Sequence, residues 1–190
     1  MKVIKILIIF CLLAVLASCK TKPTGGNSVF KYSQFASGGT QSVLDATILF
    51  ANSNSTFTKY QVAYTSCTCR GPETNYRSVM YIELLNTKPT KDEASIRRIS
   101  FDKIDNANVG LWGDSNPIYG KPDYTSEYMN EHFVQQLVGK TKKDFDAWGG
   151  YGKQIAGITA DAVSGATVST SNITSVIKEL FKYHTDKYYK

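Results

Sequence analysis

One stretch near the end of this chain of 190 residues determines its fold: Ile173-Thr174-Ser175-Val176-Ile177-Lys178-Glu179-Leu180-Phe181. Its apolar side chains recur at i, i+3, i+4, i+7 and i+8, so they form one stripe along an α-helix. Hydroxyl side chains that can cap the helix start precede the stretch: Ser169, Thr170 and Ser171. Residues that complement the carbonyl end of the helix dipole follow it: Lys182, His184 and Lys187. Such a stripe needs an apolar surface to pack on.

The segments before residue 102 predict that surface, because they are rich in β-branched and aromatic residues. Three strands are expected at residues 43–50, 60–65 and 76–84, and a shorter one at 96–101. Short polar clusters separate them, which favours antiparallel neighbours. Strands first and helices later indicate an α+β fold, with helices packed on an antiparallel sheet.

Two more helical segments are expected between the strands and the final helix. Residues 126–138 place their apolar side chains near one face, and Gly139 ends this segment. Residues 141–145 predict a short helical turn, with Thr141 as its N-cap and Asp144 as the capping partner.

The N-terminus has the features of a bacterial export signal. An apolar run from residue 6 to residue 17 follows Lys2 and Lys5, and it is too short to span a bilayer as a helix. It ends in Leu16-Ala17-Ser18-Cys19, which resembles the lipobox of bacterial lipoproteins, whose cysteine becomes the acylated first residue of the mature chain. We therefore expect a signal peptide at 1–18, and we expect Cys19 to anchor the protein in a bacterial cell membrane on its extracytoplasmic side. An ordinary cleaved signal peptide with an incidental cysteine is the alternative.

The rest of the chain divides into a tether and one domain. Residues 19–42 are rich in Thr, Lys, Pro, Gly, Ser and Gln, which predicts a flexible tether, and residues 43–190 suffice for one domain with a hydrophobic core. Removal of the two lysines of the signal peptide lowers the formal net charge from +6 to +4. Basic and acidic residues are interspersed and no nucleic-acid motif occurs, so we expect no nucleic-acid binding. We interpret His132 and His184 as surface or helix-terminus residues rather than ligands.

The segment Asp161-Ala162-Val163-Ser164-Gly165-Ala166-Thr167 forms a small, hydroxyl-rich turn before the last helix. It resembles the attachment signal D-x-x-S-G-A-T of the FMN-binding domain family, typified by the flavin-carrying subunits of membrane redox complexes. The resemblance implies that Thr167 carries FMN through a phosphodiester bond, which a separate FAD-dependent flavin transferase makes. Looser counterparts of the family pattern lie upstream at residues 110–113 and 132–140.

The residues of this segment suit the chemistry that the resemblance implies. Gly165 and Ala166 add little bulk beside the acceptor hydroxyl of Thr167. The remaining phosphodiester charge would lie at the start of the last helix, where free N–H groups favour an anion, and further hydroxyl donors are at hand: Ser164, Ser169 and Thr170. Asp161 is expected to serve recognition by the transferase or to order the turn. The same residues also suit an ordinary helix-capping turn, and family register alone favours Thr167 over Ser164 or Ser169 as the acceptor.

The cysteines and aromatic residues leave several alternatives open. Cys67 and Cys69 are the only thiols expected to remain free after signal cleavage and acylation, and their C-x-C spacing does not suit a zinc or iron–sulfur site. In an oxidising compartment they predict a small disulfide, which serves either as a staple or as a redox partner of the flavin; two reduced thiols are the other alternative. Aromatic residues that either stack on a flavin ring or pack locally are Trp112, Tyr119, Trp148 and Tyr151.

Together these resemblances imply a lipid-anchored electron carrier whose membrane donor and acceptor are unknown. Neither a Ser-His-Asp arrangement nor a paired-carboxylate site is apparent, and an electron carrier needs no catalytic acid or base. We therefore expect an electron-transfer protein rather than a stand-alone enzyme, without a metal site. The alternative function is a surface lipoprotein of the same fold that binds a ligand or partner without flavin.

Overall fold

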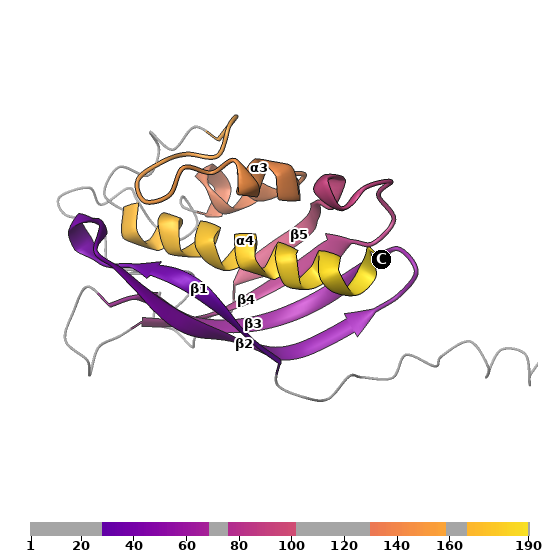
Figure 1. The fold of residues 1–190 in the computed structure, drawn as a ribbon, viewed down its shortest axis with the longest axis horizontal. Helices are drawn as coiled ribbons and strands as arrows, with labels where there is room; N and C mark the ends of the chain where they lie inside the picture. The colour runs from indigo at the N-terminus through magenta and orange to yellow at the C-terminus, as the bar shows by residue number, and fades with distance from the viewer. Residues whose placement is uncertain (1–27, 69–75, 102–129, 159–166, 190) are drawn as a thin grey trace, which may run out of the picture.

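The computed structural model describes residues 28–68, 76–101, 130–158 and 167–189. Its strands form a single five-stranded antiparallel sheet in which each strand pairs with the next one along the chain (Figure 1). Their bounds are β1 (Ser28–Phe35), β2 (Gln41–Ser53), β3 (Phe57–Cys67), β4 (Tyr76–Leu85) and β5 (Ile96–Phe101). The expected α+β fold is therefore confirmed.

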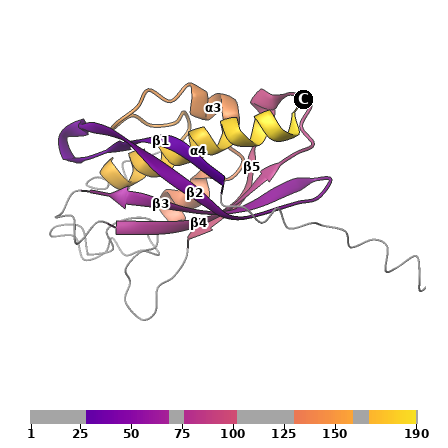
Figure 2. The ribbon, with the colours of Figure 1, turned by 60° about the horizontal axis from the view of Figure 1, so that its bottom comes forward.

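The longer helices all lie on one face of this sheet. The helix α4 crosses it and contacts β1, β3 and α3, and Figure 2 shows that α3 and α4 share the same side. The helical elements are η1 (Ser37–Gly39), η3 (Lys91–Glu93), η4 (Val134–Leu137), α3 (Lys142–Asp146) and α4 (Thr167–Tyr188). Within the described ranges, no helix combines the length and the apolar character needed to cross a bilayer.

The hydrophobic core lies between α4 and the sheet. The apolar stripe of α4, from Ile173 to Phe181, is completely buried, as its periodicity predicts. Strand β3 supplies the opposite wall through alternate residues such as Tyr60 and Val62, which are 2% and 0% exposed. Phe145 of α3 packs on Phe181 with ring centroids 5.3 Å apart, so α3 closes the core from above α4.

The prediction of a flexible tether at 19–42 was wrong from Ser28 onward. Strand β1 occupies residues 28–35 of that range, β2 begins at Gln41, and Tyr32 and Phe35 are buried in the core. The sequence did not indicate this strand because its outward side chains, such as Lys31, are polar. Strand β1 lies at the edge of the sheet, where outward residues contact water.

The continuous helix expected at 126–138 was also wrong. In its described part, helical residues 130–132 give way to a turn at Phe133, with φ −129° and ψ −60°, and then to η4. Phe133 is 4% exposed, so its burial in the core accompanies the break. The turn expected at 141–145 is confirmed, because Thr141 and Asp144 form the reciprocal hydrogen bonds of a capping box before α3.

Candidate functional site

The first described residue of α4 is Thr167, the predicted attachment site, and its side chain is half-buried. The helix already includes Thr167, so the prediction that Ser169, Thr170 or Ser171 caps its start was wrong. These three residues lie inside the helix, where the Thr170 hydroxyl donates to the Thr167 carbonyl at 3.3 Å. The other residues of the predicted signal lie outside the described ranges: Asp161, Ser164, Gly165 and Ala166.

A tight turn lies directly beside Thr167. Gly152 has φ +68°, a left-handed conformation that favours glycine, and a Cβ placed there would lie 3.6 Å from Cγ2 of Thr167. The backbone N–H of Gly152 donates to Oγ of Ser171 at 3.2 Å, which ties the turn to α4. Nε1 of Trp148 donates to the Lys153 carbonyl at 2.9 Å and closes the turn from its other side. The surroundings of Thr167 are thus held by backbone and side-chain hydrogen bonds together.

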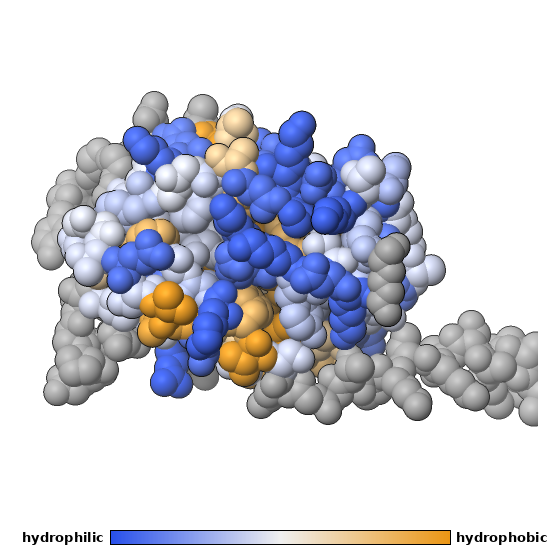
Figure 3. All heavy atoms as spheres, viewed as in Figure 1, coloured by the Kyte–Doolittle hydropathy of each residue, from blue (hydrophilic) through white to orange (hydrophobic). Residues whose placement is uncertain are grey.

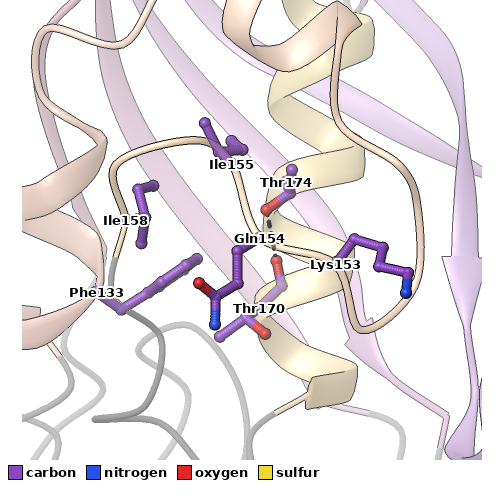
Figure 4. Close-up of a pocket in the computed structure, with 7 residues that line it drawn as sticks. All are labelled: Phe133, Lys153, Gln154, Ile155, Ile158, Thr170 and Thr174. Atoms are coloured by element: carbon purple, nitrogen blue, oxygen red, sulfur yellow. Dashed lines mark hydrogen bonds between the residues drawn. The ribbon is translucent and has the colours of Figure 1, made fainter.

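A small hollow that is open to solvent lies next to this turn, and we call it the pocket. Ile155 and Ile158 line it from the segment before residue 159, and Thr170 and Thr174 line it from α4, so both flanks of the predicted attachment segment converge on it (Figure 4). Its other lining residues are Phe133, Lys153 and Gln154.

The polar groups of the pocket differ in direction. The Gln154 amide points between Phe133 and Thr170, whereas the Lys153 side chain extends away from them (Figure 4). The hydroxyl of Thr174 is turned back to the Thr170 carbonyl at 2.8 Å. Gln154 is therefore the polar side chain most directly presented to an occupant. Sequence reasoning missed Gln154 and Lys153, since neither belongs to a motif.

Asn172 joins α4 to two strands and is completely buried. Its Oδ1 accepts from the Phe35 N–H at 2.7 Å, while its Nδ2 donates to the carbonyls of Phe35 at 3.0 Å and Ser66 at 2.8 Å. A buried amide that is fully paired in this way stabilises one arrangement of the backbone. Its place directly before the apolar stripe, on the face that meets the sheet, was the sequence signal for this role.

We call the three hydrogen bonds of the Asn172 side chain the Asn172 clamp, and this clamp also brings Cys67 to the Thr167 end of the molecule. Asn172 binds the carbonyl of Ser66, which directly precedes Cys67. Thr167 and Asn172 are five positions apart in the helix, which is about 7.5 Å along its axis. Cys67 is disulfide-bonded and 1% exposed, which contradicts the alternative of two reduced thiols. The other three cysteines, including the expected partner Cys69, lie outside the described residues.

Two of the four candidate aromatic residues pack on Phe35. Trp148 meets its ring edge-on with centroids 6.0 Å apart, and Tyr151 meets it at a tilt with centroids 5.6 Å apart. Both contacts are local packing between the turn and the end of β1. Trp112 and Tyr119 lie outside the described residues.

The opposite end of α4 holds a buried histidine: His184 lies near the helix terminus, one of the two expected positions, but the expectation of a surface position was wrong. His184 is completely buried, with Nδ1 3.0 Å from the Tyr60 hydroxyl and Nε2 3.2 Å from the Leu85 carbonyl. Since a carbonyl only accepts, we assign the proton to Nε2, and Nδ1 then accepts from Tyr60. Burial lowers the pKa of His184 to about 4. Extension of the apolar stripe by one more turn from Phe181 would have found this residue.

The described residues contain no group of three or more His, Cys, Asp or Glu side chains arranged to hold a metal ion. No protein-family model, curated protein or solved structure matches this chain.

Proposed function

We propose that the protein is a lipid-anchored, extracytoplasmic electron carrier with FMN covalently attached to Thr167. The observation that carries the proposal is the position of Thr167, the first described residue of α4, beside a pocket lined from both flanks of the attachment-like segment. Neither composition nor periodicity required the two flanks to converge there.

The residues around Thr167 suit a phosphodiester-linked group. Thr167 is only half-buried, and Gly152 presents no side chain toward it. The N–H groups in the first turn of a helix lack intrahelical acceptors, so they favour the single negative charge that the phosphodiester keeps. The hydrogen bond from Gly152 to Ser171 holds the neighbouring turn close to this first turn.

The pocket beside Thr167 would contact part of a covalently attached FMN. Covalently held FMN provides one- and two-electron transfer, and that chemistry belongs to the cofactor. Phe133, Ile155 and Ile158 would offer it apolar contacts, and the Gln154 amide would offer it a hydrogen-bond donor and acceptor. The chain itself therefore binds and orients, and it needs no catalytic acid or base.

Location explains why attachment is covalent. A diffusible cofactor would be lost outside the cytoplasm, whereas an esterified one is retained. Acylated Cys19 keeps the carrier near its membrane donor and acceptor. A separate FAD-dependent flavin transferase makes the bond, with Asp161 serving its recognition of the turn.

The proposal is tested by co-expression of the full-length chain with such a transferase in a bacterial host. In-gel flavin fluorescence should appear for the wild type and for Thr56→Ala, a matched control in the loop between β2 and β3. It should be absent for Thr167→Ala. Equal fluorescence of Thr167→Ala and the wild type would exclude Thr167 as the acceptor. A dark wild type beside an active transferase would favour the flavin-free lipoprotein.

A further inference from the structure

The face of the sheet that points away from α4 exposes large apolar side chains. The most hydrophobic patches in Figure 3 lie near the lower edge of that view, where Figure 1 draws β1 and β2. We call four residues of this outer face the apolar strip: Val29, Leu49, Phe50 and Tyr81, which are 39–54% exposed. The register places them outward, because Phe50 and Tyr81 both lie opposite Gln61, whose neighbours Tyr60 and Val62 point into the core.

A β-bulge creates the most unusual part of the strip. The register of β2 against β3 shifts between Ile48 and Phe50, so Leu49 is an extra residue without a partner on β3. Leu49 and Phe50 are consequently both exposed, while Ile48 and Ala51 on either side are buried. An alternating strand would have buried one of the two. The bulge thus presents two adjacent apolar side chains to the outside, where folding gains nothing from them.

The chain enters the sheet at the same place. Ser28, the first residue of β1, pairs with Ile48, directly beside the bulge. Nine residues separate Ser28 from Cys19, a length that spans at most about 30 Å. An acyl anchor on Cys19 therefore holds the apolar strip within reach of the bilayer.

The charges on the outer face favour an anionic surface. Asp45 is paired with Lys31 at 2.9 Å, and Glu83 lies between Lys59, at 3.5 Å, and Arg97. The described part of this face carries two more exposed arginines, Arg77 and Arg98, of which Arg98 lies opposite Glu83 in the register of β4 and β5. Exposed apolar side chains among excess cations are typical of protein surfaces that bind anionic membranes.

We propose that the outer face of the sheet lies on the surface of the bilayer that holds Cys19, with the apolar strip at the boundary between headgroups and acyl chains. This orientation rests on the lipid anchor of the proposed function and extends it. Because α4 lies on the opposite face of the sheet (Figure 2), the helix that carries Thr167 would lie on the side away from the lipid. The electron-transfer partner then reaches the flavin from the aqueous side.

The test places a tryptophan either on the outer face or, as a control, beside the β5 edge of the sheet, where the Gly139 N–H donates to the Ile96 carbonyl, in the full-length, membrane-extracted protein. Phe50→Trp reports the outer face, and Val138→Trp is the matched control, because Val138 follows η4 and its exposure of 41% is close to the 43% of Phe50. Both variants keep the native tryptophans, whose signal is subtracted with the wild type. The proteins are reconstituted into vesicles of brominated phosphatidylcholine and phosphatidylglycerol. We expect brominated acyl chains to quench Trp at position 50 at least about twofold and to leave position 138 unchanged.

Two further readouts separate this inference from the anchor. Vesicles without phosphatidylglycerol, and Arg98→Glu with it, should weaken the quenching at position 50. Equal quenching at both positions, or none at position 50, would overturn the orientation even when intact mass shows an acylated Cys19. If an unacylated chain showed strong quenching at position 50 alone, the outer face would still be the membrane-binding face, but the lipid anchor on Cys19 would be excluded.

Discussion

The two ends of α4 bury polar groups in different ways. At its start, Asn172 and Ser171 bind the backbone of other elements, namely Phe35, Ser66 and Gly152. At its end, the neutral ring of His184 lies among aromatic side chains, and both of its nitrogens make hydrogen bonds. The first arrangement positions backbone around a half-exposed residue, and the second fixes the helix on the sheet. The proposed ligand site and a buried histidine that fixes the helix on the sheet thus share one helix.

The largest effect is expected from loss of the Asn172 clamp. Asn172→Ala leaves the Phe35 N–H and the Phe35 and Ser66 carbonyls without their partner in the core, so the free energy of unfolding should fall by about 4 kcal/mol. Urea unfolding of the purified protein measures the loss. Asn172→Asp keeps the acceptor for Phe35 N–H but offers no donor to the carbonyls, so it should also be strongly destabilised. A loss below about 1 kcal/mol for Asn172→Ala would show that the Asn172 clamp is not a main source of the stability of this end of α4.

The histidine lock should make stability depend on pH. The pKa of His184 is about 4 in the folded state against 6.5 for the free side chain, so the unfolded chain binds the extra proton between these values. The free energy of unfolding should therefore decrease by about 3 kcal/mol as pH falls from 6.5 to 4, and this contribution is fully present above pH 6.5.

Variants of the two histidines assign this pH dependence. His184→Phe should be less stable at pH 7, because the Tyr60 hydroxyl loses its acceptor, and the slope between pH 4 and 6.5 should flatten. His132→Gln is the matched control and should retain the slope. Unchanged slopes in His184→Phe would show that other groups cause the acid sensitivity.

A smaller effect is expected at the turn beside Thr167. Gly152→Ala places a Cβ on a backbone with φ +68°, so it should destabilise the protein by about 1 kcal/mol. The strained turn would also lie in van der Waals contact with Cγ2 of Thr167, at 3.6 Å from the new Cβ, and flavin loading should decrease. Gly149→Ala is the control, because Gly149 does not have a positive φ. Thermal unfolding and in-gel fluorescence measure the two effects, and equal behaviour of both variants would separate the turn from the site.

The smallest stability effect is expected for Gln154→Ala, although Gln154 is the most directly presented polar group of the pocket. Its side chain is exposed, so the free energy of unfolding should change by less than about 0.5 kcal/mol. The absorption spectrum of the attached flavin should nevertheless shift. A large loss of stability with an unchanged spectrum would make Gln154 a structural residue.

The parts of the fold that the sequence predicts are those with a local physical signal. The stripe from Ile173 to Phe181 and the capping box of Thr141 and Asp144 depend on contacts within one or two helical turns. Strand β1 was missed because its place depends on pairing with β2, to which its polar outward residues give no clue.

The site was predicted only as far as its motif. The Asn172 clamp joins residues more than 100 positions apart, and the bulge at Leu49 depends on register between strands, so neither follows from a local pattern. His184 continues the periodicity of α4, but a titratable side chain is usually exposed. Its burial depends on the Tyr60 hydroxyl and the Leu85 carbonyl on the sheet.

The proposed flavin is attached to the half-buried Thr167, at the end of α4 that lies opposite the buried His184. The most direct test is peptide mapping by mass spectrometry of the wild-type protein, extracted from membranes of cells that contain the transferase. We expect peptide mapping to find the mass of FMN, less one water, on the side chain of Thr167. An unmodified Thr167, or an adduct on Ser164 or Ser169 instead, would contradict it.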